Sequence, residues 1–185
     1  MYEFYNGAIK EVTLARKKMM SSTAQSVINA DRFNLTVLPG FSEDTRVVFE
    51  GRGHESFGAH PSNLIISFCQ KPMANYQRRG DDLIYTHTMT LLEAMQMQPV
   101  IVETLDNRKV FVAPSDVITP QTELRVCGEG MPRAVKGEVV TDTITQLQLE
   151  KDRPRGDLIV RFNILFPRKV LIENRQEILA ALRAN

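Results

Sequence analysis

The 185-residue sequence is poor in the residues that build metal sites, disulfide frameworks and membrane spans. It has two cysteines, three histidines and no tryptophan. Cys69 and Cys127 stand alone in strand-like segments, without a Cys-x-x-Cys pair or clustered histidines, so neither a zinc site nor a disulfide framework is expected. No apolar run approaches the roughly 18 residues of a membrane span. We expect a globular chain that binds no metal and no cofactor, with both cysteines as reduced core thiols.

The sequence also lacks an excess of charge of either sign. The 23 Lys+Arg residues nearly cancel the 22 Asp+Glu residues, which leaves a formal net charge of +1. Such a balance provides no overall field that would attract nucleic acid or a membrane surface, so neither is expected as a partner. The opening MYEFYNGAIK has no basic region followed by an apolar one, so no secretory signal is expected. With reduced cysteines, this predicts a cytoplasmic protein.

What the sequence does contain is alternation of apolar and polar residues over short runs, which is typical of half-buried strands. Helix signals are few: residues 91–97, a turn at 2–5 closed by Gly7, and an amphipathic segment after Pro167. We therefore predict a mainly β protein. The predicted strands are residues 32–38, 45–50, 64–69, 82–90, 100–105, 109–113, 122–127 and 157–166.

One pattern occurs twice along the chain. A threonine, a strand and a Gly-x-Gly occur at residues 45–53 and again at 122–130, and each copy follows a short helix and another strand. We predict two tandem, similar β-sandwich domains, at residues 1–74 and 75–167, followed by a C-terminal helix at 168–185. Linker signals occur between the domains, over QKPMANYQRRGDDLIY. The second copy has a strand ahead of its helix and the first has none. We infer that the first domain is cut, or is natively short, by its leading strand, which would leave an open sheet edge.

The Gly-x-Gly pattern itself does not predict phosphate binding. A phosphate loop leads into a helix N-terminus, whereas both copies here leave a strand and enter a loop. The two Arg-Gly-Asp tripeptides, at 79–81 and 155–157, each precede a predicted strand, so we interpret them as turns. No paired nucleophile and base and no acid/base dyad is found, and we expect no enzyme activity.

Several longer motifs carry a resemblance to a known family. The sequence VCGEGMP followed by RGDLIVRFNILFP, together with RRGDDLIYTHTMTLLEA, ETLDNRKV and YNGAIKEVTLARKK, resembles the C-terminal substrate-binding region of DnaJ-type co-chaperones, the forty-kilodalton heat-shock class. The resemblance runs over essentially the whole chain. The family's J domain and Cys-x-x-Cys-x-Gly-x-Gly repeats are not found, and MMSSTAQSVINAD (19–31) stands where the zinc module would be inserted. This indicates the zinc-free second class.

The resemblance implies that the region binds unfolded client polypeptides and delivers them to a DnaK-type chaperone, the seventy-kilodalton heat-shock protein. By motif, the family's apolar client groove corresponds to Val12, Leu14 and Ile66. Val12 and Leu14 alternate along one strand and so share a sheet face beside the expected open edge, which an extended peptide could join. From the residues alone, ordinary core positions remain the alternative for all three.

The resemblance also implies a site for the acidic C-terminal tail of the DnaK-type chaperone. Lys10 matches one lysine position of that site and Thr13 replaces the next. Arg16, Lys17 and Lys18 keep the end of the strand basic and could compensate. A solvated basic surface is the alternative interpretation.

The C-terminal segment carries an apolar stripe with near-helical spacing. Its members are Leu171, Ile178, Leu179 and Leu182. The stripe packs either on its own domain or on a partner chain, and we favour a homodimer, because a terminal helix has little of its own domain left to cover. The alternative to a client-binding function is a structural or oligomerising β module.

Overall fold

The computed structural model describes residues 1–19, 26–133, 137–140, 154–168 and 176–180, and it is mainly β as predicted. Leu171 and Leu182 of the C-terminal stripe lie outside these residues. The first half contains α1 (Tyr2–Asn6), β1 (Ala8–Met19), β2 (Ser26–Val37), β3 (Thr45–Phe49) and β4 (Leu64–Ser67). The remaining elements are β5 (Tyr76–Arg79), β6 (Asp82–Thr90), α2 (Leu91–Met95), β7 (Val100–Glu103), β8 (Lys109–Val112), β9 (Glu123–Val126), β10 (Gly137–Val140) and β11 (Leu158–Leu165).

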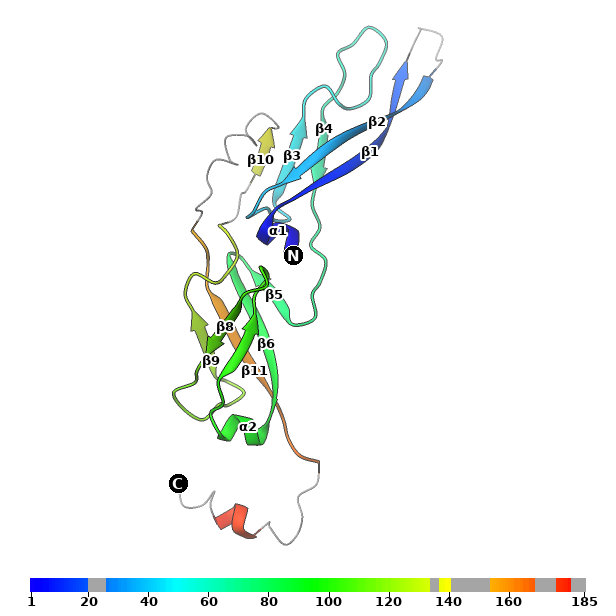
Figure 1. Ribbon diagram of the computed structural model, residues 1–185. Helices are drawn as coiled ribbons and strands as arrows, with labels where there is room; N and C mark the ends of the chain where they lie inside the picture. Colours follow the sequence, from blue (N-terminus) through cyan, green and yellow to red (C-terminus); the bar gives the residue numbers. More distant parts are fainter. Residues whose placement is uncertain (20–25, 134–136, 141–153, 169–175, 181–185) are drawn as a thin grey trace.

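The first half consists of a long hairpin over a small sheet. β1 and β2 pair antiparallel from Ala8↔Val37 to Met19↔Ser26, and β4 pairs antiparallel with β3. The two sheets meet where the ring of Phe33 on β2 lies 4.8 Å from the ring of Phe49 on β3. The far end of the hairpin points away from the second half and lies beside the loop between β3 and β4 (Figure 1).

The second half repeats these parts and adds two strands, β5 and β6. The hairpin β7–β8 corresponds to β1–β2, and β9 with β11 corresponds to β3 with β4. In addition, β6 pairs in parallel with β11, and β5 pairs with the other side of β6. Helix α2 follows β6 directly and begins with a capping box, in which Thr90 Oγ1 accepts from the Glu93 backbone N–H and Glu93 accepts from the Thr90 backbone N–H.

The repeat extends to the hydrogen bonds of the two Gly-x-Gly loops. In each loop the first glycine N–H donates to the side-chain oxygen of a residue directly before a strand, β4 in the first half and β11 in the second. The second glycine N–H donates to the backbone carbonyl one residue earlier. The four pairs are Gly51–Asn63 at 3.1 Å, Gly53–Ser62 at 2.6 Å, Gly128–Asp157 at 3.1 Å and Gly130–Gly156 at 2.8 Å. The first loop therefore links the end of β3 to the start of β4, and the second links the end of β9 to the start of β11.

Two strands were not anticipated from the sequence. β5 lies in the segment that we interpreted as a linker, and Tyr76 at its start is buried. β10 comes from the chain between β9 and β11, yet it pairs in parallel with β3 of the first half (Figure 1). The division into domains at 1–74 and 75–167 stays a prediction.

The interpretation of the cysteines as core residues is wrong. Cys69 and Cys127 are free and exposed. Each follows a strand in which alternate residues are half-buried, Leu64–Phe68 and Leu124–Val126, and each continues the exposed set. The period of two therefore places both thiols on the solvent side.

Candidate functional site

The three predicted groove residues lie on the inner faces of the two first-half sheets, and all three are half-buried. Val12 on β1 is opposite Phe33, and Ile66 on β4 is opposite the fully buried Val47. Directly opposite residues of an antiparallel pair share a face. Val12 and Ile66 pack against the core cluster with part of their surface exposed. Leu14 is equally half-buried.

The alternation along β1 explains this arrangement. From Val12 to Lys18 the even-numbered residues are half-buried, whereas the odd-numbered residues from Ile9 to Lys17 are exposed. Because side chains alternate across a strand, one face of β1 is turned towards the sheet of β3 and β4, and the other face is turned towards solvent. Val12 and Leu14 therefore form an apolar pair on a partly covered face, with Thr13 between them on the opposite face.

Within the described residues, the edge of β1 that faces away from β2 is paired only at its far end, near Lys17 and Lys18. The Glu55 backbone N–H donates to Lys17 O at 3.0 Å, and Lys18 forms an isolated bridge with Glu55. Among the described strands, β1 otherwise pairs with β2 alone. The edge beside Val12 and Leu14 thus offers backbone N–H and C=O groups to an added strand.

Arg16 is held inside the first half. Its Nε donates to Gly53 O at 2.7 Å and its Nη2 donates to Gly51 O at 3.2 Å, so its guanidinium holds the Gly-x-Gly loop against β1. Its Nη1 donates to Asp31 Oδ2 at 3.2 Å. These contacts use the fork of donors that arginine provides, and they leave the guanidinium engaged within the chain.

The lysines of the predicted tail site differ in their contacts. Lys10 Nζ lies 2.8 Å from Glu3 Oε1, and Lys18 Nζ lies 3.2 Å from Glu55 Oε2. Both pairs are partly exposed and so contribute little to stability. Lys17 is exposed, and no ion pair joins it to the part of the chain that the structure describes. All three lysines lie on β1.

Residues 176–180 are helical, and Ile178 and Leu179 in this helix are exposed. Within the described residues these two side chains are therefore available to a partner, as a dimerisation stripe requires.

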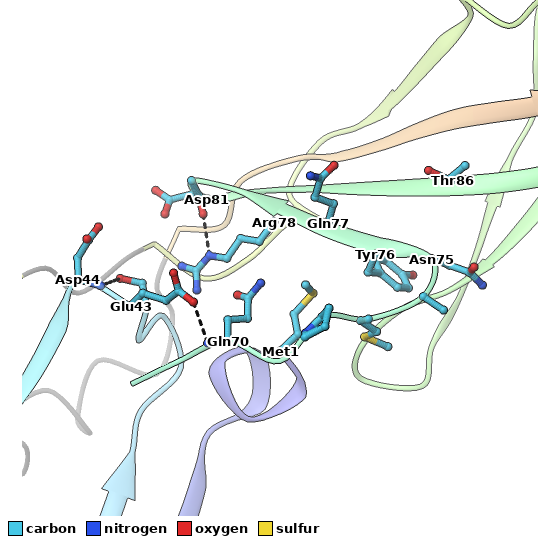
Figure 2. Close-up of a pocket in the computed structure, with 15 residues that line it drawn as sticks. Met1, Glu43, Asp44, Gln70, Asn75, Tyr76, Gln77, Arg78, Asp81 and Thr86 are labelled. Atoms are coloured by element: carbon cyan, nitrogen blue, oxygen red, sulfur yellow. Dashed lines mark hydrogen bonds between the residues drawn. The ribbon is translucent and has the colours of Figure 1, made fainter. Parts of the chain in front are cut away.

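A polar cavity of about 820 Å³, which we did not predict, lies where the two halves meet (Figure 2). Arg78 from β5 reaches across it and donates to Phe41 O at 2.7 Å and to Gly80 O at 2.8 Å. Burial lowers the pKa of Arg78, although the neighbouring carboxylates, Asp81 first among them, act in the opposite direction. Glu43 accepts a hydrogen bond from the Gln70 backbone N–H at 2.9 Å. The hydrogen bond from Arg78 to Phe41 O joins the two halves, and the polar lining distinguishes the cavity from an apolar groove.

Sequence reasoning missed the exposed apolar side chain of Ile65. It lies on β4 beside Ile66, points to the opposite face and is 54% exposed. Its period-two position between Leu64 and Ile66 was the available signal. The described residues contain no group of three or more potential metal ligands and no helix that is long and apolar enough to cross a membrane.

Comparison with known proteins identifies the family. The model of the DnaJ C terminal domain matches residues 1–167. The chain is 28% identical over 175 residues to DnaJ homolog subfamily B member 5 of Homo sapiens, covering 94% of this chain and 46% of that protein. It is 26% identical over 180 residues to DnaJ homolog subfamily B member 13 of Homo sapiens, covering 97% and 52%. It is 33% identical over 143 residues to Chaperone protein DnaJ 2 of Aquifex aeolicus (strain VF5), covering 75% and 33%. The chain thus spans about half the length of the first two relatives, and less of the third.

Proposed function

The chain belongs to the DnaJ C-terminal domain family, and we propose that it is a non-catalytic co-chaperone region that holds extended segments of unfolded client proteins in its first half. The proposal rests mainly on the half-buried apolar pair Val12 and Leu14. Beside this pair, the outer edge of β1 has no strand partner among the described residues. Ile66 supplies the apolar side chain of the facing sheet.

The expected affinity is moderate. Full burial of a large aliphatic side chain is worth about 1.5–3 kcal/mol, and these three side chains are already half-buried, so each contributes roughly half of that. Backbone hydrogen bonds to the β1 edge add a few kcal/mol, against which association and ordering costs are set. Because these costs offset much of the gain, the balance favours weak binding, no tighter than roughly micromolar. Such binding suits a carrier that passes its client to a DnaK-type chaperone.

We further propose that the acidic C-terminal tail of the DnaK-type chaperone binds at Lys10, Lys17 and Lys18. The ion pairs of Lys10 with Glu3 and of Lys18 with Glu55 are partly exposed and cost little to exchange for a new carboxylate. Arg16 is not among the tail contacts that we propose, because its guanidinium is already engaged by Gly51 O and Gly53 O. We propose that the protein acts in the cytoplasm.

The C-terminal helix is the proposed dimerisation element. Exposed Ile178 and Leu179 would pack against a second chain, which would give a two-fold clamp with two grooves. Light scattering after size exclusion tests this, with the whole chain and a chain ending at Pro167. A monomer in both cases would contradict the clamp.

The client-binding proposal is tested by suppression of aggregation of a chemically unfolded protein. Leu14→Asp places a charge in the apolar pair, and Thr13→Asp, its matched control, places the same charge on the exposed face one residue away. Circular dichroism establishes that both variants are folded. The expected result is loss of suppression for Leu14→Asp alone.

A structural or oligomerising β module is the competing function. Such a module would not suppress aggregation of the unfolded protein at any concentration of the original chain. Equal suppression by the two aspartate variants would reject the groove even if the chain retains client proteins.

A further inference from the structure

We propose that the loop between β3 and β4 forms an end wall of the client site, and that it confines a bound segment to the part of β1 from Ile9 to Ala15. That an extended polypeptide occupies the outer edge of β1, which faces away from β2, rests on the proposed function. The end wall consists of the loop residues Gly53, His54 and Glu55, which contact the far end of β1.

The outer edge of β1 is independent of any strand ahead of α1. In the second half, β6 precedes α2 and pairs with β5 and β11, whereas β7, the counterpart of β1, pairs with β8 alone among the described strands. A strand in the corresponding place of the first half would lie beside β4, the counterpart of β11. The outer edge of β1 would therefore stay open whether or not such a strand is present.

The contacts of Lys17 show which backbone groups point to this edge. Its N–H donates to His54 Nδ1 at 3.3 Å, and its C=O accepts from the Glu55 N–H at 3.0 Å, so both groups point away from β2. Along an antiparallel strand, residues that point both groups to the partner alternate with residues that point both away from it. β1 pairs with β2 without a break. The other residues that point both groups to the outer edge, here called the outward residues, are therefore Ile9, Glu11, Thr13 and Ala15.

The loop takes the place of an added strand at the far end of β1. Lys18 forms a parallel bridge with Glu55, and Glu55 Oε2 lies 3.2 Å from Lys18 Nζ. Arg16 secures the same loop, because its Nε donates to Gly53 O at 2.7 Å and its Nη2 lies 3.8 Å from Glu55 Oε2. Both backbone groups of Lys17 are thus already engaged by the end wall. An extended segment along β1 meets the loop before it can pair with Lys17.

The end wall is also held from its other side. Gly53 N–H donates to Ser62 O at 2.6 Å. His54 O accepts from the Ser62 N–H at 3.0 Å and from Ser62 Oγ at 3.2 Å. A Cβ at Gly53 would collide with Ser62 and Asn63, so only glycine fits at this position. A client would have to break contacts on both sides of the loop to move it, and we therefore expect the wall to limit the client rather than to yield to it.

These observations define the occupant. It is an extended segment of about seven residues, because the open part of the edge runs from Ile9 to Ala15 and paired strands have the same rise per residue. Its alternate residues that share the half-buried face of Val12 and Leu14 are apolar, and those on the exposed face are polar. The end wall thus selects the length of the paired segment, and the face of β1 selects its pattern.

Amide hydrogen exchange, followed by NMR, tests the end wall in the original chain. Without a peptide, the amides of the outward residues should exchange fast. The Lys17 amide should exchange at least about tenfold more slowly than these, because His54 accepts its hydrogen bond. His54→Ala should abolish that difference, whereas His60→Ala, which changes an exposed histidine of the same loop, should keep it. Exchange at Lys17 as fast as at the outward residues would overturn the proposal.

The probe for binding is a series of labelled peptides of alternating leucine and serine, with about five, seven, nine or eleven residues. Affinity for the original chain should rise up to about seven residues and then change by less than about twofold. At saturation the peptide should slow exchange at the outward residues and leave the Lys17 and Glu55 amides unchanged. Faster exchange at Glu55 would show that the client displaces the loop, and would overturn the end wall.

A double variant removes both contacts of Lys17 with the end wall. His54→Ala removes the acceptor for its N–H, and Glu55→Pro removes the donor to its C=O. His60→Ala with Glu55→Gln is the matched control, which keeps both contacts. In the first variant the peptide of about nine residues should bind at least about threefold more tightly than that of about seven. The control should behave as the original chain does. An unchanged length limit in the folded first variant would overturn the proposal, and if this variant does not fold, exchange at Lys17 and Glu55 in the original chain decides.

The outcomes separate the end wall from the proposed function. Binding of no peptide, or binding without slower exchange at the outward residues, would reject the groove on β1 and the wall with it. An affinity that keeps rising with length in the original chain would retain client binding and overturn the wall alone. Slower exchange at the outward residues that depends on chain concentration, without peptide, would assign the edge to a second copy and overturn the proposal as well.

Discussion

Replacing Arg16 with methionine tests whether this residue serves the fold or a ligand. Methionine keeps much of the apolar stem but removes donors to Gly51 O, Gly53 O and Asp31. A net hydrogen bond contributes about 0.5–1.5 kcal/mol. The Arg16 side chain is 17% exposed, but Asp31 is more exposed and its interaction is discounted for screening. We expect a loss of about 2 kcal/mol in the free energy of unfolding.

The assay is urea unfolding followed by circular dichroism, with Lys17→Met as the matched control. Lys17 is the next residue and is exposed, so its replacement should change stability by less than about 0.5 kcal/mol. For a chain of this length, 2 kcal/mol corresponds to a fall of roughly 4–8 °C in Tm.

The same two variants are then titrated with an acidic peptide that represents the chaperone tail. Arg16→Met should bind it within about twofold of the original affinity at a temperature where it is folded, whereas Lys17→Met should bind more weakly. Equal stability of the two variants, or loss of tail binding in Arg16→Met alone, would refute the structural role of Arg16.

Three further predictions concern strain, packing and pH. Met97 has a φ of 52°, which costs a residue with a Cβ about 1–2 kcal/mol, so Met97→Gly should stabilise the fold by about 1 kcal/mol in urea unfolding, while Met95→Gly in α2 should destabilise it by about as much. Gly156→Ala should lower the free energy of unfolding by about 1–3 kcal/mol through collision with Asp81, measured by the same method, while Ser62→Gly should change it by less than about 1 kcal/mol. Burial raises the pKa of Tyr76 above its ordinary value of 10.0. The unfolded chain therefore loses the Tyr76 proton first as pH rises, and the free energy of unfolding should fall above about pH 10. Thermal melts of Tyr76→Phe should show a smaller fall in stability above that pH, because the variant has no phenol to titrate.

The parts of the fold that were predicted from the sequence are those that local patterns determine. The period of two predicted β6 and β11 closely, because both faces of their sheet have a clear assignment. The Gly-x-Gly loops were correctly interpreted as strand connections, since no helix follows them. β5 was missed because Pro72 and a polar run dominate the segment, although Tyr76 finds a buried place against the second half.

The contacts between distant segments could not be predicted. Nothing in the residues near 137–140 indicates pairing with β3, which depends on how the two halves are placed. The engagement of Arg16 by Gly51 O and Gly53 O likewise depends on the path of a loop that begins 35 residues later. The exposure of Cys69 was available from the alternation along β4, but the hydrophobic character of cysteine was given more weight.

The central claim is that the first half holds extended polypeptide against β1. The most direct measurement is photo-crosslinking of a permanently unfolded, labelled protein from a benzophenone side chain placed at Leu14, at Thr13 or at Phe111. Phe111 lies in the corresponding hairpin of the second half and is 71% exposed, so it controls for apolar exposure alone. The account predicts adducts from position 14, and few from positions 13 and 111. Equal adducts from position 111, or none from position 14, would contradict it.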